Sequence, residues 1–205
     1  MTIDSMMELR KLKTIRRFNL REMIQTDTDA SHSYYTTILA IDIADYINKT
    51  TNYKFSTEEF AALMIEALYH DSEESILGDV ITPTKYSEAN FSEYLVAYRA
   101  LTNTIRTSML VSLPGVGLID KNYTTTITLG DWVLKLADKL EAYTTSSEEI
   151  WLGNKFFVPI RDSILSAISK ILFEVRVSDD FAEYSETLIE YVNSYRNRVE
   201  AYLSL

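Results

Sequence analysis

The sequence predicts an all-α domain of six or seven helices, and two observations lead to this fold class. Apolar residues recur with the period of an α-helix along most of the chain. Glycine and proline are scarce, with five and three residues, which argues against the many tight turns of a β-sandwich or a barrel. With 46% hydrophobic and 24% charged residues, the 205-residue chain has enough apolar material for a full core. We therefore expect a single domain that spans residues 1–205.

The first long helices are predicted from apolar spacing and from their start signals. In Tyr34–Ile47, apolar residues fall on successive turns, and the preceding stretch "TDTDAS" offers several N-cap residues. Ser56 and Glu59 have the spacing of a capping box, and an apolar stripe follows over residues 60–68. These signals predict one helix on each side of a short connection.

The second half of the chain predicts four more helices. Pro83 breaks the chain, and a helical pattern then runs from about Ser87 to Leu110. Helical spacing returns at Gly130–Tyr143, at about Pro159–Val175 and at about Asp179–Leu203.

Composition narrows the function classes. The chain has no cysteine, so a disulfide framework, a thiolate metal site and a cysteine nucleophile are excluded. The N-terminal stretch "MTIDSMMELRKLKTIRRF" has no continuous apolar core, and no segment approaches the roughly 20 apolar residues of a membrane span. A net charge of −10 disfavours nonspecific binding to long nucleic acid, although it leaves room for a local basic pocket. We expect a cytoplasmic protein with no membrane partner.

Three short stretches carry residue types that bind metals through nitrogen and oxygen. The chain has two histidines: His32 in the first turn of one predicted helix, and His70 beside Asp71 at the end of the next. Adjacent helical residues point about 100° apart, so His70 and Asp71 can bind one ion only where the helix bends or ends. Asp138 lies on an otherwise apolar segment, where a charge is costly unless a metal or a cation compensates it. Taken singly, each histidine can also be a hydrogen-bonded structural residue, and Asp138 an exposed helical aspartate.

Together these residues resemble the HD superfamily of metal-dependent phosphohydrolases, and most closely its bacterial 5′-deoxynucleotidases. The resemblance covers about residues 10–143, the expected core, and leaves residues 144–205 as a C-terminal helical extension. Most of it lies in "ALYHDSEESILGDVITPTKY", from Ala67 to Tyr86. There the family reads His-Asp, Glu three residues after the Asp, Gly-Asp, and Thr-Pro-x-Lys-Tyr. The matching residues are His70, Asp71, Glu74, Gly78, Asp79, Thr82, Pro83, Lys85 and Tyr86.

An arginine followed by an aromatic residue stands fifteen positions before the first metal histidine in this family. Here the pair is Arg17 and Phe18, although the deoxynucleotidases typically have Trp at the second position. Ser31 stands where the family often has Glu. By the spacing alone, Arg16 could take the place of Arg17, and Phe18 could instead be a core residue of a first helix.

The resemblance implies an HD-domain helical bundle with a divalent metal ion (Zn, Mn, Co, Fe or Mg). It implies His32, His70, Asp71 and Asp138 as metal ligands. Glu74 is then the candidate to orient or deprotonate the attacking water, with the solvated acidic pair Glu73–Glu74 as the alternative. The resemblance gives Asp79 a role in proton transfer to the leaving group or in a sugar contact.

Three further residues are expected to bind the substrate. A planar two-pronged donor such as Arg17 suits phosphate oxygens, and Lys85 is a candidate second cation. An aromatic face at Phe18 can stack on the sugar or base and exclude a 2′-hydroxyl. For Lys85, an ordinary surface lysine is an equal alternative.

The leading functional hypothesis is a metal-dependent phosphohydrolase that removes the 5′-phosphate of deoxynucleoside monophosphates. One alternative is a phage-type phosphohydrolase of deoxynucleoside triphosphates such as dATP. An alternative of another class is a non-catalytic helical protein that binds nucleotides. We also expect a homo-oligomer, a dimer or larger, because the helical chain is rich in Tyr, Leu and Ile and because the relatives assemble in this way.

Overall fold

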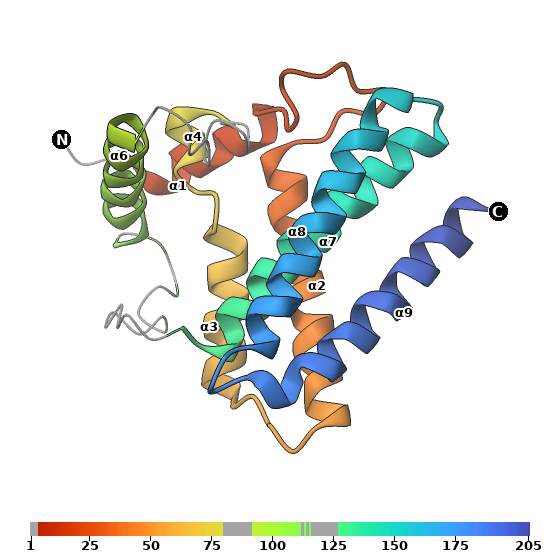
Figure 1. Cartoon of the computed structure of the whole chain (residues 1–205). Coiled ribbons are helices and arrows are strands. Elements are labelled where there is room, and N and C mark those ends of the chain that lie inside the picture. Colours follow the sequence, from red (N-terminus) through yellow and green to blue (C-terminus); the bar gives the residue numbers. More distant parts are fainter. Residues whose placement is uncertain (1–3, 80–91, 112, 114, 116–126) are drawn as a thin grey trace.

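The computed structural model describes residues 4–79, 92–111, 113, 115 and 127–205, and within them every regular element is a helix (Figure 1). The six long helices are α2 (Asp29–Thr50), α3 (Thr57–Tyr69), α6 (Ser92–Leu110), α7 (Leu129–Trp151), α8 (Val158–Arg176) and α9 (Ser185–Leu203). The short elements are α1 (Ser5–Leu9), α4 (Glu74–Leu77) and three 3₁₀ turns, Arg10–Thr14, Lys155–Phe157 and Ala182–Tyr184. The predicted all-α class is confirmed.

The core lies where α2, α3, α7 and α8 pack against one another. Ile43 of α2, Leu63 of α3 and Leu136 of α7 are buried there. Ile168 of α8 and Leu188 of α9 belong to the same apolar cluster. Residues of the predicted C-terminal extension therefore share one core with the N-terminal helices, and Val199 in the second half of α9 belongs to the same cluster. α9 runs along one side of the bundle and ends at its rim (Figure 1).

Side-chain caps define where three of the long helices begin. Thr28, Ser56 and Thr128 are N-caps of α2, α3 and α7, each in a reciprocal capping box with the residue three positions later. The capping box predicted at Ser56 and Glu59 is thus present. Thr28 lies in the stretch "TDTDAS" that was predicted to supply the N-cap of α2, and the helix begins five residues before the apolar stripe at Tyr34, since apolar spacing marks a buried face and not a helix end.

Other predicted boundaries differ from the structure. α7 continues past Tyr143 to Trp151, through a polar stretch that gives no apolar spacing. Ser146 and Ser147 in this stretch are buried, and each donates a hydrogen bond to the Tyr143 carbonyl. α9 begins at Ser185, because a 3₁₀ turn precedes it. The start predicted for the helix that ends at Leu110 lies outside the described residues, as does Pro83.

The N-terminal elements place the loop of residues 15–28 beside the end of α4. α1, the 3₁₀ turn Arg10–Thr14 and α4 contact one another. The loop from Ile15 to Thr28 then leads into α2, and Asn19 in this loop donates a hydrogen bond to the Asp79 carbonyl, 2.6 Å away. Among the described helices, none is both long and apolar enough to cross a membrane.

Candidate metal centre

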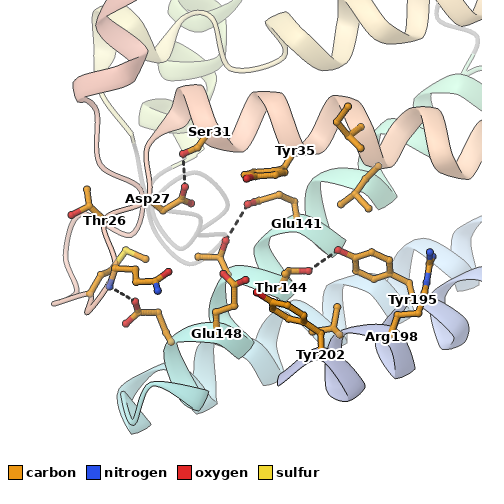
Figure 2. A pocket seen from close by; sticks show the side chains of 17 residues that line it. Thr26, Asp27, Ser31, Tyr35, Glu141, Thr144, Glu148, Tyr195, Arg198 and Tyr202 are labelled. Atoms are coloured by element: carbon orange, nitrogen blue, oxygen red, sulfur yellow. Dashed lines mark hydrogen bonds between the residues drawn. The ribbon is translucent and has the colours of Figure 1, made fainter. Parts of the chain in front are cut away.

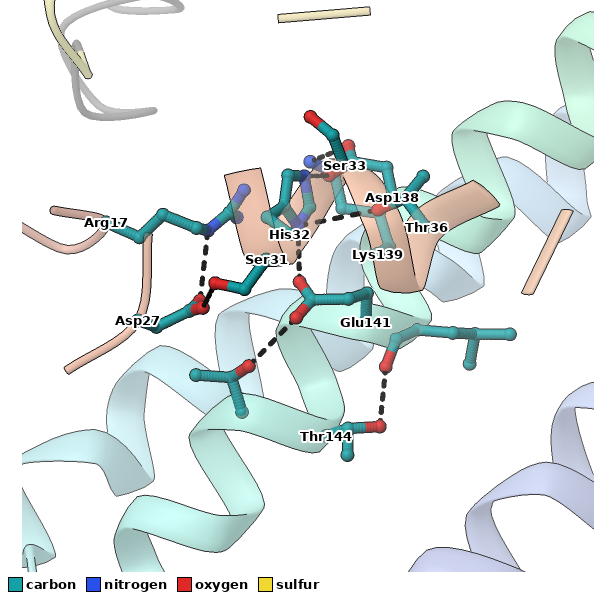
Figure 3. A network of polar contacts seen from close by, with 12 residues as sticks. Arg17, Asp27, Ser31, His32, Ser33, Thr36, Asp138, Lys139, Glu141 and Thr144 are labelled. Atoms are coloured by element: carbon teal, nitrogen blue, oxygen red, sulfur yellow. Dashed lines mark hydrogen bonds and ion pairs between the residues drawn. The ribbon is translucent and has the colours of Figure 1, made fainter. Parts of the chain in front are cut away.

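His32 lies in the first turn of α2 with its imidazole fully buried between two carboxylates of α7. Its Nε2 is 3.2 Å from Asp138 Oδ1, and its Nδ1 contacts the carboxylate of Glu141 on the opposite edge of the ring (Figure 3). Asp138 and Glu141 are three residues apart on α7, which places them on one helix face. One turn of α7 therefore engages both ring nitrogens of His32.

His70 and Asp71 stand where α3 ends. His70 is the C-cap of α3, and the Asp71 that follows lies in a turn. This is the arrangement that the sequence required for both side chains to reach one ion. His70 Nε2 is 3.1 Å from His32 Nε2, and Asp71 Oδ2 is 3.0 Å from His70 Nε2 and 3.6 Å from His32 Nε2.

The hydrogen bonds behind the two rings set their tautomers. His70 Nδ1 is 2.8 Å from the Ala67 carbonyl, which can only accept, so Nδ1 carries the proton. His32 Nδ1 faces the Glu141 carboxylate, which likewise only accepts when ionised. In the neutral rings, both Nε2 atoms therefore present lone pairs to the same point, together with the oxygens of Asp71 and Asp138.

This donor set fits a divalent metal ion. Four electron pairs converge with no proton donor among them, so the point requires a positive charge. The ligand atoms of His32, His70 and Asp138 all lie within 4.8 Å of one another, and Asp71 reaches the same two imidazoles. Two imidazoles and two carboxylates suit Zn and other first-row transition metals.

The pKa shifts of the metal-free cluster also indicate a site that attracts a cation. Burial alone lowers the pKa of His32, but the carboxylates of Glu141 and Asp138 outweigh it and raise the pKa to about 9. Burial alone raises the pKa of Asp138, but Lys139, whose Nζ is 2.8 Å from Oδ2, and His32 hold it well below its usual range. The pocket therefore attracts a proton or another cation at neutral pH.

Two buried carboxyl groups lie next to this cluster. Glu74 begins α4, its backbone N–H donates to the Asp71 carbonyl at 3.0 Å, and its side chain is buried. Glu74 is thus a buried group and not one of a solvated acidic pair. Its neighbour is Asp29, also fully buried, whose pKa is raised to about 6 by burial in spite of the contact with Glu74 and the charge of Arg17.

Arg17 reaches the cluster from the loop before α2. Its backbone N–H donates to the Asp27 carbonyl at 3.1 Å, and its Nε is 3.6 Å from Asp27 Oδ2. Asp27 in turn accepts a hydrogen bond of 2.6 Å from Ser31 (Figure 3). Burial alone lowers the pKa of Arg17, but Glu141, Asp138 and other nearby carboxylates raise it above the ordinary value. Arg17 is therefore a permanent cation beside the candidate metal ligands.

Phe18 lies in a turn, not in a first helix as one interpretation of the sequence had it. Its φ of 51° is in the left-handed region, which is strained for a non-glycine residue. The ring packs edge-on against the buried Phe157, with centroids 5.3 Å apart. Packing against Phe157 thus fixes the orientation of the Phe18 ring.

Asp79 follows Gly78, the C-cap of α4, whose φ of 74° supplies the predicted turn. The hydrogen bond from Asn19 ties this turn to the loop of Arg17 and Phe18. Lys85 lies outside the described residues.

Two pockets flank the centre. One, of about 400 Å³, is lined by Arg16, Arg17 and Arg21, and is the kind of local basic pocket that an acidic chain can still hold. The other, of about 650 Å³, lies between α2, α7 and α9, and Asp27 and Glu141 form part of its wall (Figure 2). None of the four candidate ligands lines either pocket.

The structure thus brings His32, His70, Asp71 and Asp138 together, with Arg17 and Glu74 beside them. Asp79 lies within electrostatic reach of the buried Asp29. Glu141, Asp27 and Asp29 were not predicted from the sequence. The one available signal was the position of Glu141 three residues after Asp138, on the same helix face.

Comparison with known proteins identifies the family. Residues 5–187 match the family model described as 5′-deoxynucleotidase YfbR-like. The chain belongs to this family. A 5′-deoxynucleotidase of Photorhabdus laumondii is 31% identical over 154 residues, which are 73% of this chain and 75% of that protein. A 5′-deoxynucleotidase of Pectobacterium atrosepticum is 30% identical over 155 residues, 73% of this chain and 74% of that protein.

Solved structures share the fold. The cyanophage S-2L HD phosphohydrolase, solved with dA and one catalytic Zn²⁺ ion, has a TM-score of 0.67 at 15% identity and covers 98% of this chain and 99% of that one. A conserved hypothetical protein from Pyrococcus furiosus has a TM-score of 0.66 at 21% identity, covering 95% and 99%. Membership of the YfbR-like family confirms the predicted enzyme class, a metal-dependent hydrolase of deoxynucleotides.

Proposed function

We propose that this chain uses a divalent metal ion to hydrolyse the 5′-phosphate of deoxynucleoside monophosphates. The observation that carries the proposal is the convergence of two imidazole nitrogens and two carboxylates on one point, beside a buried arginine. The curated relatives named 5′-deoxynucleotidase support the monophosphate as the substrate.

His32, His70, Asp71 and Asp138 would hold the metal ion. When bound, such an ion lowers the pKa of a water molecule and neutralises charge on a phosphoryl group. The similar fold of the cyanophage S-2L HD phosphohydrolase, solved with a catalytic Zn²⁺, supports zinc as the metal. The same four ligands also suit Mn, Co or Fe.

Glu74 is the proposed general base. It stands three residues after Asp71 and is buried next to the cluster, where a carboxylate can take a proton from the attacking water. Asp79 is proposed to pass a proton to the leaving group or to contact the sugar. The Asn19 hydrogen bond to its backbone supports a fixed position for Asp79.

Arg17 is proposed to bind the phosphate. Its Nε faces Asp27, which leaves the two terminal guanidinium nitrogens to meet phosphate oxygens. The basic pocket of Arg16, Arg17 and Arg21 supports this assignment. Lys85 is proposed as a second cation near the phosphate.

Phe18 is proposed to select against ribonucleotides. Its ring is adjacent to Arg17, whose guanidinium carbon is 5.6 Å from the ring centroid. Packing against Phe157 would keep the ring in place as one wall of the sugar site. Excluding a hydroxyl in this way discriminates by about 1–3 kcal/mol.

A homo-oligomer, at least a dimer, and a cytoplasmic location complete the proposal. Tyr35 and Ile38 of α2 and Tyr202 of α9 are exposed by 56%, 48% and 67%, and all three line the pocket between these helices. Such a group of exposed apolar side chains is typical of an interaction surface. Sedimentation at micromolar concentration checks it, and only the 23.6 kDa species would contradict it.

The test of the function is phosphate release from a panel of mono- and triphosphates, in deoxy and ribo forms, with several divalent metals and with a chelator. We expect release from deoxynucleoside monophosphates that the chelator abolishes. Release from dATP alone would replace the monophosphate with a triphosphate. A protein that contains no metal and releases nothing would instead support the non-catalytic nucleotide-binding alternative.

A further inference from the structure

Glu141 is a buried carboxylate with no proposed part in metal ligation, proton transfer or substrate binding. It lies on α7 and only 4% of the residue is exposed. Its Oε2 contacts His32 Nδ1, on the ring edge away from the candidate metal ligands (Figure 3). Burying a carboxylate is costly, and an apolar side chain of similar size would fill the space at lower cost. The contact with His32 is therefore the feature that needs a physical reason.

The carboxylate decides which nitrogen of His32 carries the proton. A neutral imidazole has one N–H and one lone pair, and the two can exchange places. Because the Glu141 carboxylate accepts a hydrogen bond from Nδ1–H of His32, the Nε2 lone pair faces Asp138, Asp71 and His70. Without Glu141, the ring is free to place its proton on Nε2 and so lose the lone pair that would bind the ion.

Glu141 is itself held in one orientation. While Oε2 contacts His32, Oε1 accepts a hydrogen bond of 3.0 Å from Thr145 Oγ1, one turn further along α7. The only other hydrogen-bond partner of His32 Nδ1 among the described residues is Thr36 Oγ1, at a longer 3.4 Å. The chain Thr145–Glu141–His32 thus orients the ring from behind.

The two histidines are supported differently. His70 Nδ1 donates to a neutral backbone carbonyl at Ala67, while His32 Nδ1 donates to a charged carboxylate. A hydrogen bond to a charged acceptor is roughly twice as strong as a neutral one and makes the opposite nitrogen a better electron donor.

We propose that Glu141 is a positioning residue that holds His32 in the tautomer and orientation needed to bind the metal ion. This inference rests on the proposed metal site. Such partners of metal-binding histidines typically contribute about 10–100-fold to metal affinity.

The test measures metal affinity in the absence of substrate. Metal-free wild type, Glu141→Ala and Glu141→Gln are titrated with Zn²⁺ against a competing chelator. The matched control is Glu148→Gln on α7. Glu148 and Glu141 both line the pocket of about 650 Å³ between α2, α7 and α9, but Glu148 does not contact His32. We expect Glu141→Ala to bind Zn²⁺ about 10–100-fold more weakly, Glu141→Gln to lie between Ala and wild type, and the control to match wild type. Gln keeps an acceptor oxygen but lacks the charge.

The tautomer supplies a second measurement that a purely structural role would not change. The chain has only two histidines, so long-range ¹H–¹⁵N spectra of the imidazoles can be assigned with His70 as the internal reference. In the metal-free protein, at a pH above the His32 pKa of about 9 where the ring is neutral, we expect a single Nδ1–H tautomer for His32 in wild type and a mixture in Glu141→Ala. If Glu141→Ala does not fold, as judged from circular dichroism, the isosteric Glu141→Gln decides.

Wild-type Zn²⁺ affinity in Glu141→Gln, or in a folded Glu141→Ala, would overturn the inference. The outcome is separable from the proposed function. A wild type that binds Zn²⁺ but releases no phosphate would refute the reaction and leave the comparison of affinities valid.

Discussion

Replacing Asp29 by asparagine should stabilise the protein at neutral pH. Asp29 is fully buried in the first turn of α2, beside Glu74, and burial raises its pKa to about 6 from an ordinary value of 3.8. A carboxyl whose folded-state pKa is raised contributes stability below pH 3.8, and this is lost as the pH rises through 6. The difference of about two pH units, at about 1.4 kcal/mol per unit, costs roughly 3 kcal/mol at pH 7 and above.

The amide that Asp29→Asn introduces carries no charge and removes this cost. The gain in the free energy of unfolding should grow between about pH 4 and pH 6 and stay constant above pH 6. The reason is that Asp29 ionises at a lower pH in the unfolded chain than in the folded protein. At pH 7.5 we expect an increase in Tm of roughly 6–12 °C, at about 2–4 °C per kcal/mol for a chain of this size.

The assay is chemical denaturation of metal-free wild type and Asp29→Asn at several pH values from about 4 to 8, the range over which the charge of this carboxyl changes. Asp45→Asn is the control, since Asp45 is an exposed aspartate on the same helix, where a surface ion pair contributes little. Either of two results would show that burial does not raise the pKa of Asp29: a free energy difference between Asp29→Asn and wild type that does not change with pH, or a variant less stable than wild type at pH 7.5.

The remaining predictions concern the site. His70→Ala should lose metal binding and activity while most helix content, measured by circular dichroism, remains; bound metal with full turnover would contradict the assignment. Glu74→Ala should retain metal but slow phosphate release by roughly 10²–10⁴-fold, and loss of the metal would make it a ligand instead. Arg17→Ala should raise KM for the deoxynucleotide far more than the same change at its neighbour Arg16, and equal effects would sink the phosphate role. Phe18→Ala should reduce the ratio of dAMP to AMP hydrolysis rates, and an unchanged ratio would remove its role.

Local signals predicted much of the fold and the place where the helix before His70 and Asp71 ends. The capping box at Ser56 and the apolar stripe after it predicted α3, and the stripe ended where His70 and Asp71 had to leave the helix. These features depend on neighbours in sequence, so the sequence alone shows them.

Contacts between distant residues could not be predicted in this way. His32 and Glu141 are 109 positions apart, and periodicity does not say which acid of α7 faces inward. For the same reason the burial of Glu149 was not predicted. Its carboxylate accepts hydrogen bonds of 2.8 Å from the backbone N–H groups of Ile24 and Gln25. A buried carboxylate looks like a surface residue until its partner is known.

The most direct test of the proposed metal-dependent reaction is phosphate release from dAMP by enzyme that has been stripped with a chelator and then titrated with a divalent metal. We expect that activity disappears on stripping, returns as the ion is added to wild type, and does not return in Asp138→Asn, in which a neutral amide replaces one of the proposed ligand carboxylates. Full activity in stripped wild type, or full recovery in Asp138→Asn, would contradict it.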